Sequence, residues 1–248
     1  MTGVLIVTGG SRGIGAACAI LGARQGYDVC VNYLENGARA DGVVAAIKAL
    51  GRRAIAVQAD MANEPDIVRM FETVDAELGA VTALINNAAR AVKYGPTSRV
   101  TAESLAPLWA TNITGPFIAS REAVKRMSTR SGGKGGAICN ISSIGVKLLG
   151  AGAFVDYAAS KAALEALTLG LAQEVADQGI RITAVRPGLI DTEIHVKSGN
   201  PNRVAEVAPT LPLKRAGTPD EVAAVVLFLL SAQASYVTKT IIDIAGGR

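Results

Sequence analysis

The stretch that decides the fold of this chain lies near its start and reads Val4-Leu5-Ile6-Val7-Thr8-Gly9-Gly10-Ser11-Arg12-Gly13-Ile14-Gly15. Its four apolar residues predict a buried strand, and the glycines after them predict a tight turn into a helix over about residues 13–25. Glycines at positions 9, 13 and 15 would let a phosphate approach the backbone, and the helix N-terminus would offer free N–H groups to a pyrophosphate. The spacing, G-x-x-x-G-x-G, differs from the standard dinucleotide motif, so a tight turn without a ligand is the alternative.

Short apolar runs and longer helical segments alternate along the rest of the chain. The other predicted strands cover residues 28–33, 54–58, 81–86, 136–141, 180–185 and 240–244. Helices are predicted in the segment that ends near residue 50 and at residues 64–78, 101–113, 115–128, 155–178 and 219–230. Strand–helix–strand units in this order form a parallel sheet with helices on both faces. We therefore predict an α/β protein with a single Rossmann-type domain over residues 1–248, built on a doubly wound, seven-stranded parallel sheet.

One stretch, residues 189–212, lacks a regular pattern. It contains three prolines together with glycine, asparagine and several charged residues. Irregular segments of this length within a compact domain are often functional loops. We expect these residues to form a mobile flap over a site.

The composition is that of a globular protein, with 50% hydrophobic and 19% charged residues. Cys18, Cys30 and Cys139 are far apart, which fits neither a disulfide framework nor a zinc site. We predict reduced core thiols, no metal site and a cytoplasmic location. The first strand leaves no room for a signal peptide. The longest apolar run, residues 222–230, is shorter than the roughly 20 residues of a membrane span, so we expect a soluble protein.

The net charge is +4, and the densest basic stretch covers residues 125–134. A solvated helix end followed by a glycine loop explains this stretch, and cations there suit the helix dipole. A nucleic-acid patch is the alternative, but no aromatic residues interleave with the charges, as stacking on bases would require. We expect no nucleic-acid partner.

The end of the second predicted strand bears on the choice of cofactor. It reads Val31-Asn32-Tyr33, without the acidic residue that often binds the ribose hydroxyls of NAD. Arg12 lies in the glycine turn, close to the same place. An uncharged strand end and a nearby arginine favour a 2′-phosphate and hence NADP, with NAD as the alternative.

Tyr157 and Lys161 stand at the start of the helix predicted at residues 155–178. Residues four apart lie on one helical face, so the ammonium can approach the phenol. A tyrosine pKa of about 10 is too high for a base near neutrality. A neighbouring cation and the positive ring of an oxidised nicotinamide would lower that pKa and make Tyr157 a usable general acid/base. Ser143, at the end of the fifth strand, could hold a substrate oxygen against the phenol.

Several motifs follow one another along the chain: Thr8 to Gly15, Asn86-Asn87-Ala88-Ala89, Asn112, Ile141-Ser142-Ser143, Tyr157-x-x-x-Lys161 and Arg186-Pro187-Gly188. With this set, the sequence resembles the short-chain dehydrogenase/reductase family over nearly all of its length. The gap of fourteen residues between Ser143 and Tyr157 resembles a subgroup of glucose-dehydrogenase-like and 3-oxoacyl-ACP-reductase-like enzymes.

The resemblance implies a catalytic tetrad of Asn112, Ser143, Tyr157 and Lys161. Tyr157 would exchange the proton and Ser143 would polarise the carbonyl. Lys161 would bind the nicotinamide ribose and lower the pKa of the tyrosine, and Asn112 would hold a water that links Lys161 to solvent. The residues implied to contact the cofactor are Gly9, Ser11, Arg12, Gly13, Ile14, Gly15, Asn32, Tyr33, Asp60, Met61, Asn87, Ala88, Ala89, Tyr157, Lys161, Pro187, Gly188, Ile190 and Thr192.

A few positions depart from the family pattern or leave a choice open. Ala89 and Lys239 stand where glycine is usual, and Lys239 would place a charge near a subunit contact. Ser142 is the alternative to Ser143 as the serine of the tetrad. His195, the sole histidine of the chain, lies in the predicted flap and is either incidental there or in contact with substrate.

The function that the resemblance implies is hydride transfer between a nicotinamide cofactor, NADP in preference to NAD, and a carbonyl compound or secondary alcohol (EC 1.1.1.-). A 3-oxoacyl thioester and a sugar of the glucose type are both candidate substrates. A dinucleotide-binding sensor or scaffold without turnover is the alternative. The run over residues 222–230 is apolar around most of its helix, which, with the habit of the family, predicts a homotetramer.

Overall fold

The computed structural model describes residues 3–248 and contains one seven-stranded parallel sheet. The strands are β1 (Val4–Val7), β2 (Asp28–Tyr33), β3 (Ala54–Gln58), β4 (Val81–Asn86), β5 (Gly136–Ile141), β6 (Ile180–Pro187) and β7 (Thr240–Ile244). Their order in the sheet is β3-β2-β1-β4-β5-β6-β7. The predicted fold class is therefore confirmed, and only β6 extends beyond its predicted end.

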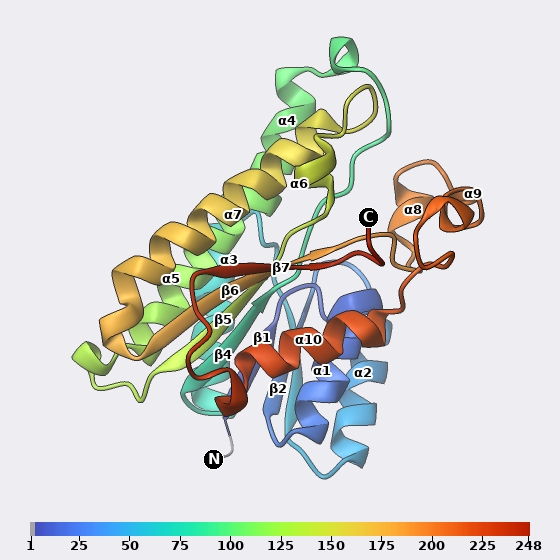
Figure 1. Cartoon of the computed structure of the whole chain (residues 1–248). Coiled ribbons are helices and arrows are strands. Elements are labelled where there is room, and N and C mark those ends of the chain that lie inside the picture. The colour runs from blue at the N-terminus through green and yellow to red at the C-terminus, as the bar shows by residue number, and fades with distance from the viewer. Residues whose placement is uncertain (1–2) are drawn as a thin grey trace.

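Helices cover both faces of the sheet (Figure 1). One face carries α1 (Gly13–Arg24), α2 (Gly37–Ala49) and α10 (Pro219–Leu230), and the other carries α3 (Glu64–Glu77), α5 (Gly115–Met127) and α7 (Val155–Val175). The helix α4 (Ala102–Trp109) runs into α5 through a π-helical turn, Ala110–Thr114, instead of forming a separate helix up to residue 113. Three short helices were not predicted: α6 (Gly145–Leu148), α8 (Ile194–Lys197) and α9 (Arg203–Val207).

Each face of the sheet has its own apolar core, as continuous Val, Ile and Leu strands require. On the α1 face the contacts are close because small residues line the helix: a Cβ on Gly22 would lie 2.6 Å from Leu5 Cδ2. Bulkier side chains such as Phe71 and Met127 fill the opposite layer. Two buried apolar layers, one on each face, therefore hold the sheet in place. They also determine where the ends of the strands lie.

The strand order reverses between β1 and β4, since the chain adds β2 and β3 on one side of β1 and the later strands on the other. In open parallel sheets ligands bind at this point, beyond the carboxyl ends of the strands. The glycine turn after β1 and the loops after β4, β5 and β6 all leave the sheet there. Helices α8 and α9 lie beyond this end of the sheet, apart from the two covering layers (Figure 1).

The apolar helix α10 is buried mostly within its own chain, against the sheet and α1. Val222, Val226 and Leu227 are fully enclosed, while Phe228 keeps 43% of its surface exposed. The predicted need for burial beyond the sheet is thus met largely by α1. In residues 3–248 we find no helix whose length and apolarity would let it cross a membrane.

Lys239, where the family pattern has glycine, has a left-handed backbone with φ of +53°. Its backbone N–H donates to Ile182 O and its Nζ donates to Gln173 Oε1 at 2.6 Å. A side chain in this conformation costs about 1–2 kcal/mol, which glycine avoids. The structure thus gives a conformational reason for the usual glycine at this position.

We predict that Lys239→Gly is more stable than Lys239→Ala by about 1 kcal/mol. Both variants lose the contact with Gln173, but alanine keeps the strained conformation that glycine relieves. Urea unfolding of the two variants measures the difference. Equal midpoints for the two proteins would show that the backbone at position 239 is not strained.

Candidate active site

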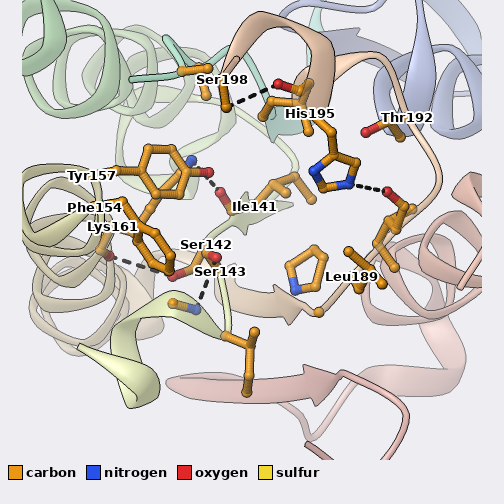
Figure 2. Close-up of a pocket in the computed structure, with 18 of the residues that line it drawn as sticks. Ile141, Ser142, Ser143, Phe154, Tyr157, Lys161, Leu189, Thr192, His195 and Ser198 are labelled. Atoms are coloured by element: carbon orange, nitrogen blue, oxygen red, sulfur yellow. Dashed lines mark hydrogen bonds between the residues drawn. The ribbon is translucent and has the colours of Figure 1, made fainter. Parts of the chain in front are cut away.

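A pocket opens where the strand order reverses, and segments from distant parts of the sequence line it (Figure 2). The structure brings ten of the predicted site residues to this one pocket: Ile14, Asn87, Ala89, Ser143, Tyr157, Lys161, Pro187, Gly188, Ile190 and Thr192. They come from the glycine turn, the loops after β4, β5 and β6, and the first turns of α7. Sequence positions almost 180 residues apart therefore meet around one cavity.

The glycine turn is fixed by contacts that leave no room for side chains. Gly9 has φ of +61°, and a Cβ on Gly15 would lie 2.4 Å from Gly9 O. The Asn87 side chain donates to Thr8 O at 2.9 Å and to Gly9 O at 3.0 Å. Asn87 therefore holds the turn against the end of β4, and glycine is required at positions 9 and 15 for steric reasons.

Asn32 fixes the same turn from the other side. Its Oδ1 accepts from the Gly9 N–H at 3.0 Å, and its Nδ2 donates to Ala59 O at 3.0 Å. The side chain is buried, so its polar atoms serve the protein itself. The half-buried side chain at this strand end is that of Tyr33. The absence of an acidic residue at position 32 thus says less about the cofactor than the sequence suggested.

The N-terminus of α1 is prepared for an anion. Arg12 precedes the helix without a side-chain cap, and the first turn contains no acidic residue. The N–H groups of such a turn are short of partners, and the helix dipole favours negative charge there. Thr192 of the flap packs beside this turn, since a Cβ on Gly13 would lie 3.4 Å from its Cγ2. These features fit the pyrophosphate of a dinucleotide.

Two arginines beside the turn share one carboxylate of the flap. Glu193 accepts from Arg39 Nη1 at 2.7 and 2.8 Å and from Arg12 Nη1 at 3.4 Å. The hydrogen bonds from Arg39 hold the pKa of the Glu193 carboxyl below its usual value. Arg39, in the first turn of α2, was not among the residues predicted from the sequence.

The Tyr157 ring and the Lys161 ammonium lie together, as their helical spacing predicted. Lys161 Nζ is 5.8 Å from the centre of the Tyr157 ring and donates to Ile141 O at 2.7 Å (Figure 2). Lys161 is 2% exposed, and burial lowers the pKa of its ammonium to about 8. Burial also raises the pKa of the Tyr157 phenol above its usual value in the protein alone.

Ser142 and Ser143 have different hydrogen-bond partners. This difference favours Ser143 over Ser142 as the serine that contacts a substrate. Ser142 is buried, and its hydroxyl donates to Glu165 Oε1 at 2.7 Å. Ser143 is partly exposed in the pocket, and its Oγ accepts from the Gly145 N–H at 3.0 Å. That contact leaves the hydroxyl proton of Ser143 free to be donated to a substrate oxygen.

Glu165 lies one helical turn after Lys161, and its carboxylate connects several elements around the site. It was not among the residues predicted from the sequence. Arg186 donates to both oxygens of this carboxylate, at 2.7 and 2.6 Å. Arg186 also donates to Asp243 of β7 at 3.2 Å. A chain of hydrogen bonds and ion pairs therefore connects the ends of β5, β6 and β7 to the helix that carries Tyr157. Such pairing of distant residues leaves no signal in spacing along the sequence.

Asn112 lies in the π-helical turn between α4 and α5 and is buried. Its side chain accepts from the Arg90 N–H at 2.7 Å and donates to Ser160 Oγ at 3.1 Å. It therefore links the loop after β4 to α7 beside Lys161. Insertions of this π type are common near functional sites.

The remaining predicted residues lie in the glycine turn and just after β3 and β4, and they do not line the pocket. Asp60 caps a turn by accepting from the Ala62 N–H at 2.8 Å, Met61 is buried, and the Ala88 N–H donates to Thr8 Oγ1 at 3.0 Å. Ser11 is partly buried within the glycine turn. Asn86 lies beneath the site, where its amide donates to Asn140 Oδ1 at 2.9 Å.

The chain is similar to known proteins over nearly its full length. The family model described as enoyl-(acyl carrier protein) reductase matches residues 9–248. The uncharacterized oxidoreductase YgfF of Escherichia coli (strain K12) is 47% identical over 245 residues, which cover 99% of each chain.

Two solved structures superpose closely, each with a TM-score of 0.90. A blue fluorescent protein from a metagenomic library, in complex with NADPH, is 35% identical, and the match covers 99% of this chain and 97% of that one. A short-chain dehydrogenase from Burkholderia cenocepacia J2315, in complex with NADP, is 34% identical, with coverage of 98% and 96%. The family match, the full-length relative and the two superposed folds agree with the resemblance seen in the sequence, and the chain belongs to the short-chain dehydrogenase/reductase family of oxidoreductases.

Proposed function

We propose that this protein transfers hydride between NADP(H) and a carbonyl compound or secondary alcohol, with Tyr157 as the general acid/base. The observation that carries the proposal is the meeting of the Tyr157 phenol, the Ser143 hydroxyl and the buried Lys161 ammonium in the pocket beside an uncapped helix N-terminus. The nicotinamide would supply or accept the hydride when bound. The protein supplies the groups that hold both reactants and move the proton.

The roles of the three side chains follow from their contacts. Ser143 donates its hydroxyl proton to the substrate oxygen, which places that oxygen against the Tyr157 phenol. Tyr157 then gives its proton to the oxygen during reduction or takes it during oxidation. Lys161 is held by a single carbonyl, so its remaining N–H groups are available to the ribose of the cofactor. Its positive charge stabilises the phenolate that forms when Tyr157 loses its proton.

The preference for NADP over NAD rests on Arg12 and Arg39 rather than on Asn32. Two guanidinium groups that share one carboxylate in the protein alone can instead hold the 2′-phosphate of the adenine ribose. Both arginines remain partly exposed and so accessible to a ligand. Both structural neighbours described above carry NADPH or NADP in their complexes, which supports the same choice.

We further propose that the protein is cytoplasmic and forms a homotetramer. Cys18, Cys30 and Cys139 are free and buried, and burial raises the pKa of each thiol, which suits a reducing cytoplasm. We take residues 1–248 as one domain with a flap at residues 189–212. Exposed apolar side chains on α5, α7 and α10 (Phe117, Leu169 and Phe228) offer contacts for a homotetramer.

We predict that Tyr157→Phe lowers kcat about 10²- to 10⁴-fold while NADPH still binds, since only the exchangeable proton is lost. Steady-state reduction of a panel of ketones and 3-oxoacyl thioesters measures kcat, and quenching of intrinsic fluorescence measures NADPH binding. Ser143→Ala should lose more activity than Ser142→Ala, because the Ser142 hydroxyl is bonded to Glu165. Full turnover by Tyr157→Phe would remove this tyrosine from the mechanism.

We predict that Arg39→Ala weakens NADPH binding about tenfold and leaves NADH binding nearly unchanged, since NADH lacks the phosphate. Glu193→Gln should strengthen NADPH binding, because the amide competes less well for both arginines. Titration calorimetry with each cofactor gives the ratio of dissociation constants. Equal losses for NADPH and NADH in Arg39→Ala would contradict a phosphate site at this residue.

We predict a mass in solution of about four times the 25.4 kDa of the chain. Multi-angle light scattering at micromolar concentration checks this, and Phe228→Glu should shift the mass downwards by placing a charge in an apolar contact. A monomeric wild type would exclude the assembly.

A further inference from the structure

His195 has one ring nitrogen that the protein leaves without a partner. The residue is 9% exposed and lines the pocket that contains Tyr157. Its Nε2 lies 2.8 Å from Ile190 O, while its Nδ1 is buried and has no hydrogen-bond partner in residues 3–248. In Figure 2 a dashed line marks the contact of one His195 ring nitrogen, which is the one with Ile190 O, and the other ring nitrogen is turned toward the side of the pocket where Tyr157 lies.

The contact with Ile190 fixes which nitrogen carries the proton. A carbonyl oxygen only accepts hydrogen bonds, so Nε2 must be the donor. In the neutral ring Nδ1 is then a bare acceptor. Leaving such an atom buried and unpaired costs about 1–3 kcal/mol, and buried polar atoms in folded proteins are rarely left so.

The surroundings of the ring limit what could pair with it. The nearby polar group, Ser198 Oγ, already donates to Ile194 O at 3.0 Å. Apolar and aromatic side chains make up much of the pocket wall, among them Tyr94, Ile144, Leu148, Phe154, Leu189 and Ile194. Ser198, Arg203 and Arg248 line it as well, and the Arg203 guanidinium stacks over the Tyr94 ring at 4.8 Å. Tyr94 and Phe154 pack against each other with ring centres 5.6 Å apart. An apolar body suits these walls better than a molecule with hydroxyl groups on every side, such as a simple sugar.

We propose that His195 Nδ1 accepts a hydrogen bond from a hydroxyl group of the substrate, and that the substrate is a carbonyl compound with an apolar body and a second oxygen function, a hydroxyl, away from the reacting carbon. The inference rests on the proposed function, because Tyr157 defines the reacting end of the same pocket. His195 lies three residues after Thr192, which packs beside the glycine turn, so the same segment would also contact the substrate. His195 is thus a residue that determines specificity.

The first test compares matched ketones that differ by one hydroxyl group: hydroxycyclohexanone with cyclohexanone, and hydroxytetralone with tetralone. We expect the wild type to favour the hydroxylated member of at least one pair about tenfold in kcat/KM. His195→Leu should reduce that ratio to near one. His195→Gln, which keeps a donor for Ile190 O and an acceptor for the hydroxyl, should restore part of it.

Ser198→Ala is the matched control, because Ser198 lines the same pocket and its hydroxyl is the alternative acceptor. We expect this variant to keep the wild-type ratio. Loss of the ratio in Ser198→Ala with its retention in His195→Leu would overturn the proposal, as would equal rates for both members of every pair in the wild type. If no ketone is reduced at all, the proposed function fails instead, and the second test still decides the role of His195.

The second test uses the fact that His195 is the sole histidine, so its ring signals in the nitrogen NMR spectrum need no assignment. In wild-type protein labelled with nitrogen-15 histidine, Nε2 should carry the proton and Nδ1 should be bare. Hydroxytetralone should move the Nδ1 signal upfield, toward that of a hydrogen-bonded nitrogen, and tetralone should not. A proton on Nδ1 in the free protein, or the same small change with both ketones, would contradict the proposal.

Discussion

The burial of one charged group, the Lys161 ammonium, explains much of the arrangement around the site. Moving a cation out of water is costly unless polar groups replace its hydration, and burial already lowers the pKa of this group to about 8. The protein supplies one fixed acceptor, Ile141 O at the end of β5, and leaves the other N–H groups toward the pocket. The sheet must therefore hold the end of β5 and the first turns of α7 in a constant relation. The ion pair of Glu165 with Arg186, one turn along the helix, contributes to that rigidity.

The glycine turn depends on a second set of fixed contacts. Asn32 and Asn87 hold its backbone from neighbouring strands, so the N-terminus of α1 faces the crevice without a cap. An uncapped helix end is a source of positive potential that an anion can satisfy. The same end of the sheet thus carries a buried cation, Lys161, and a helix N-terminus suited to an anion, an arrangement that fits a dinucleotide with its pyrophosphate at the helix and a ribose at the lysine.

Residues 192–195 contact both parts of the site. Thr192 packs beside Gly13, Glu193 pairs with two arginines next to the glycine turn, and His195 lines the pocket on the side of the substrate. One short segment therefore contacts the cofactor side and the substrate side at once. The contacts of Thr192, Glu193 and His195 therefore lie within four consecutive residues.

The sequence by itself determined the succession of strands and helices along the chain, the glycine turn and the four-residue spacing that brings Tyr157 and Lys161 together. Those features are local: apolar runs, glycine positions and a spacing of four along a helix leave direct marks in the chain. Only the tertiary structure decided which polar atoms pair across the sheet. It turned Asn32 inward, brought Arg39 and Glu193 together from positions 154 residues apart, joined Glu165 to Arg186 and left Nδ1 of His195 without a partner. The physical reason is that pairing between distant residues depends on which strands are neighbours in the sheet and on where each strand ends. The spacing of residues along the sequence does not reveal either property.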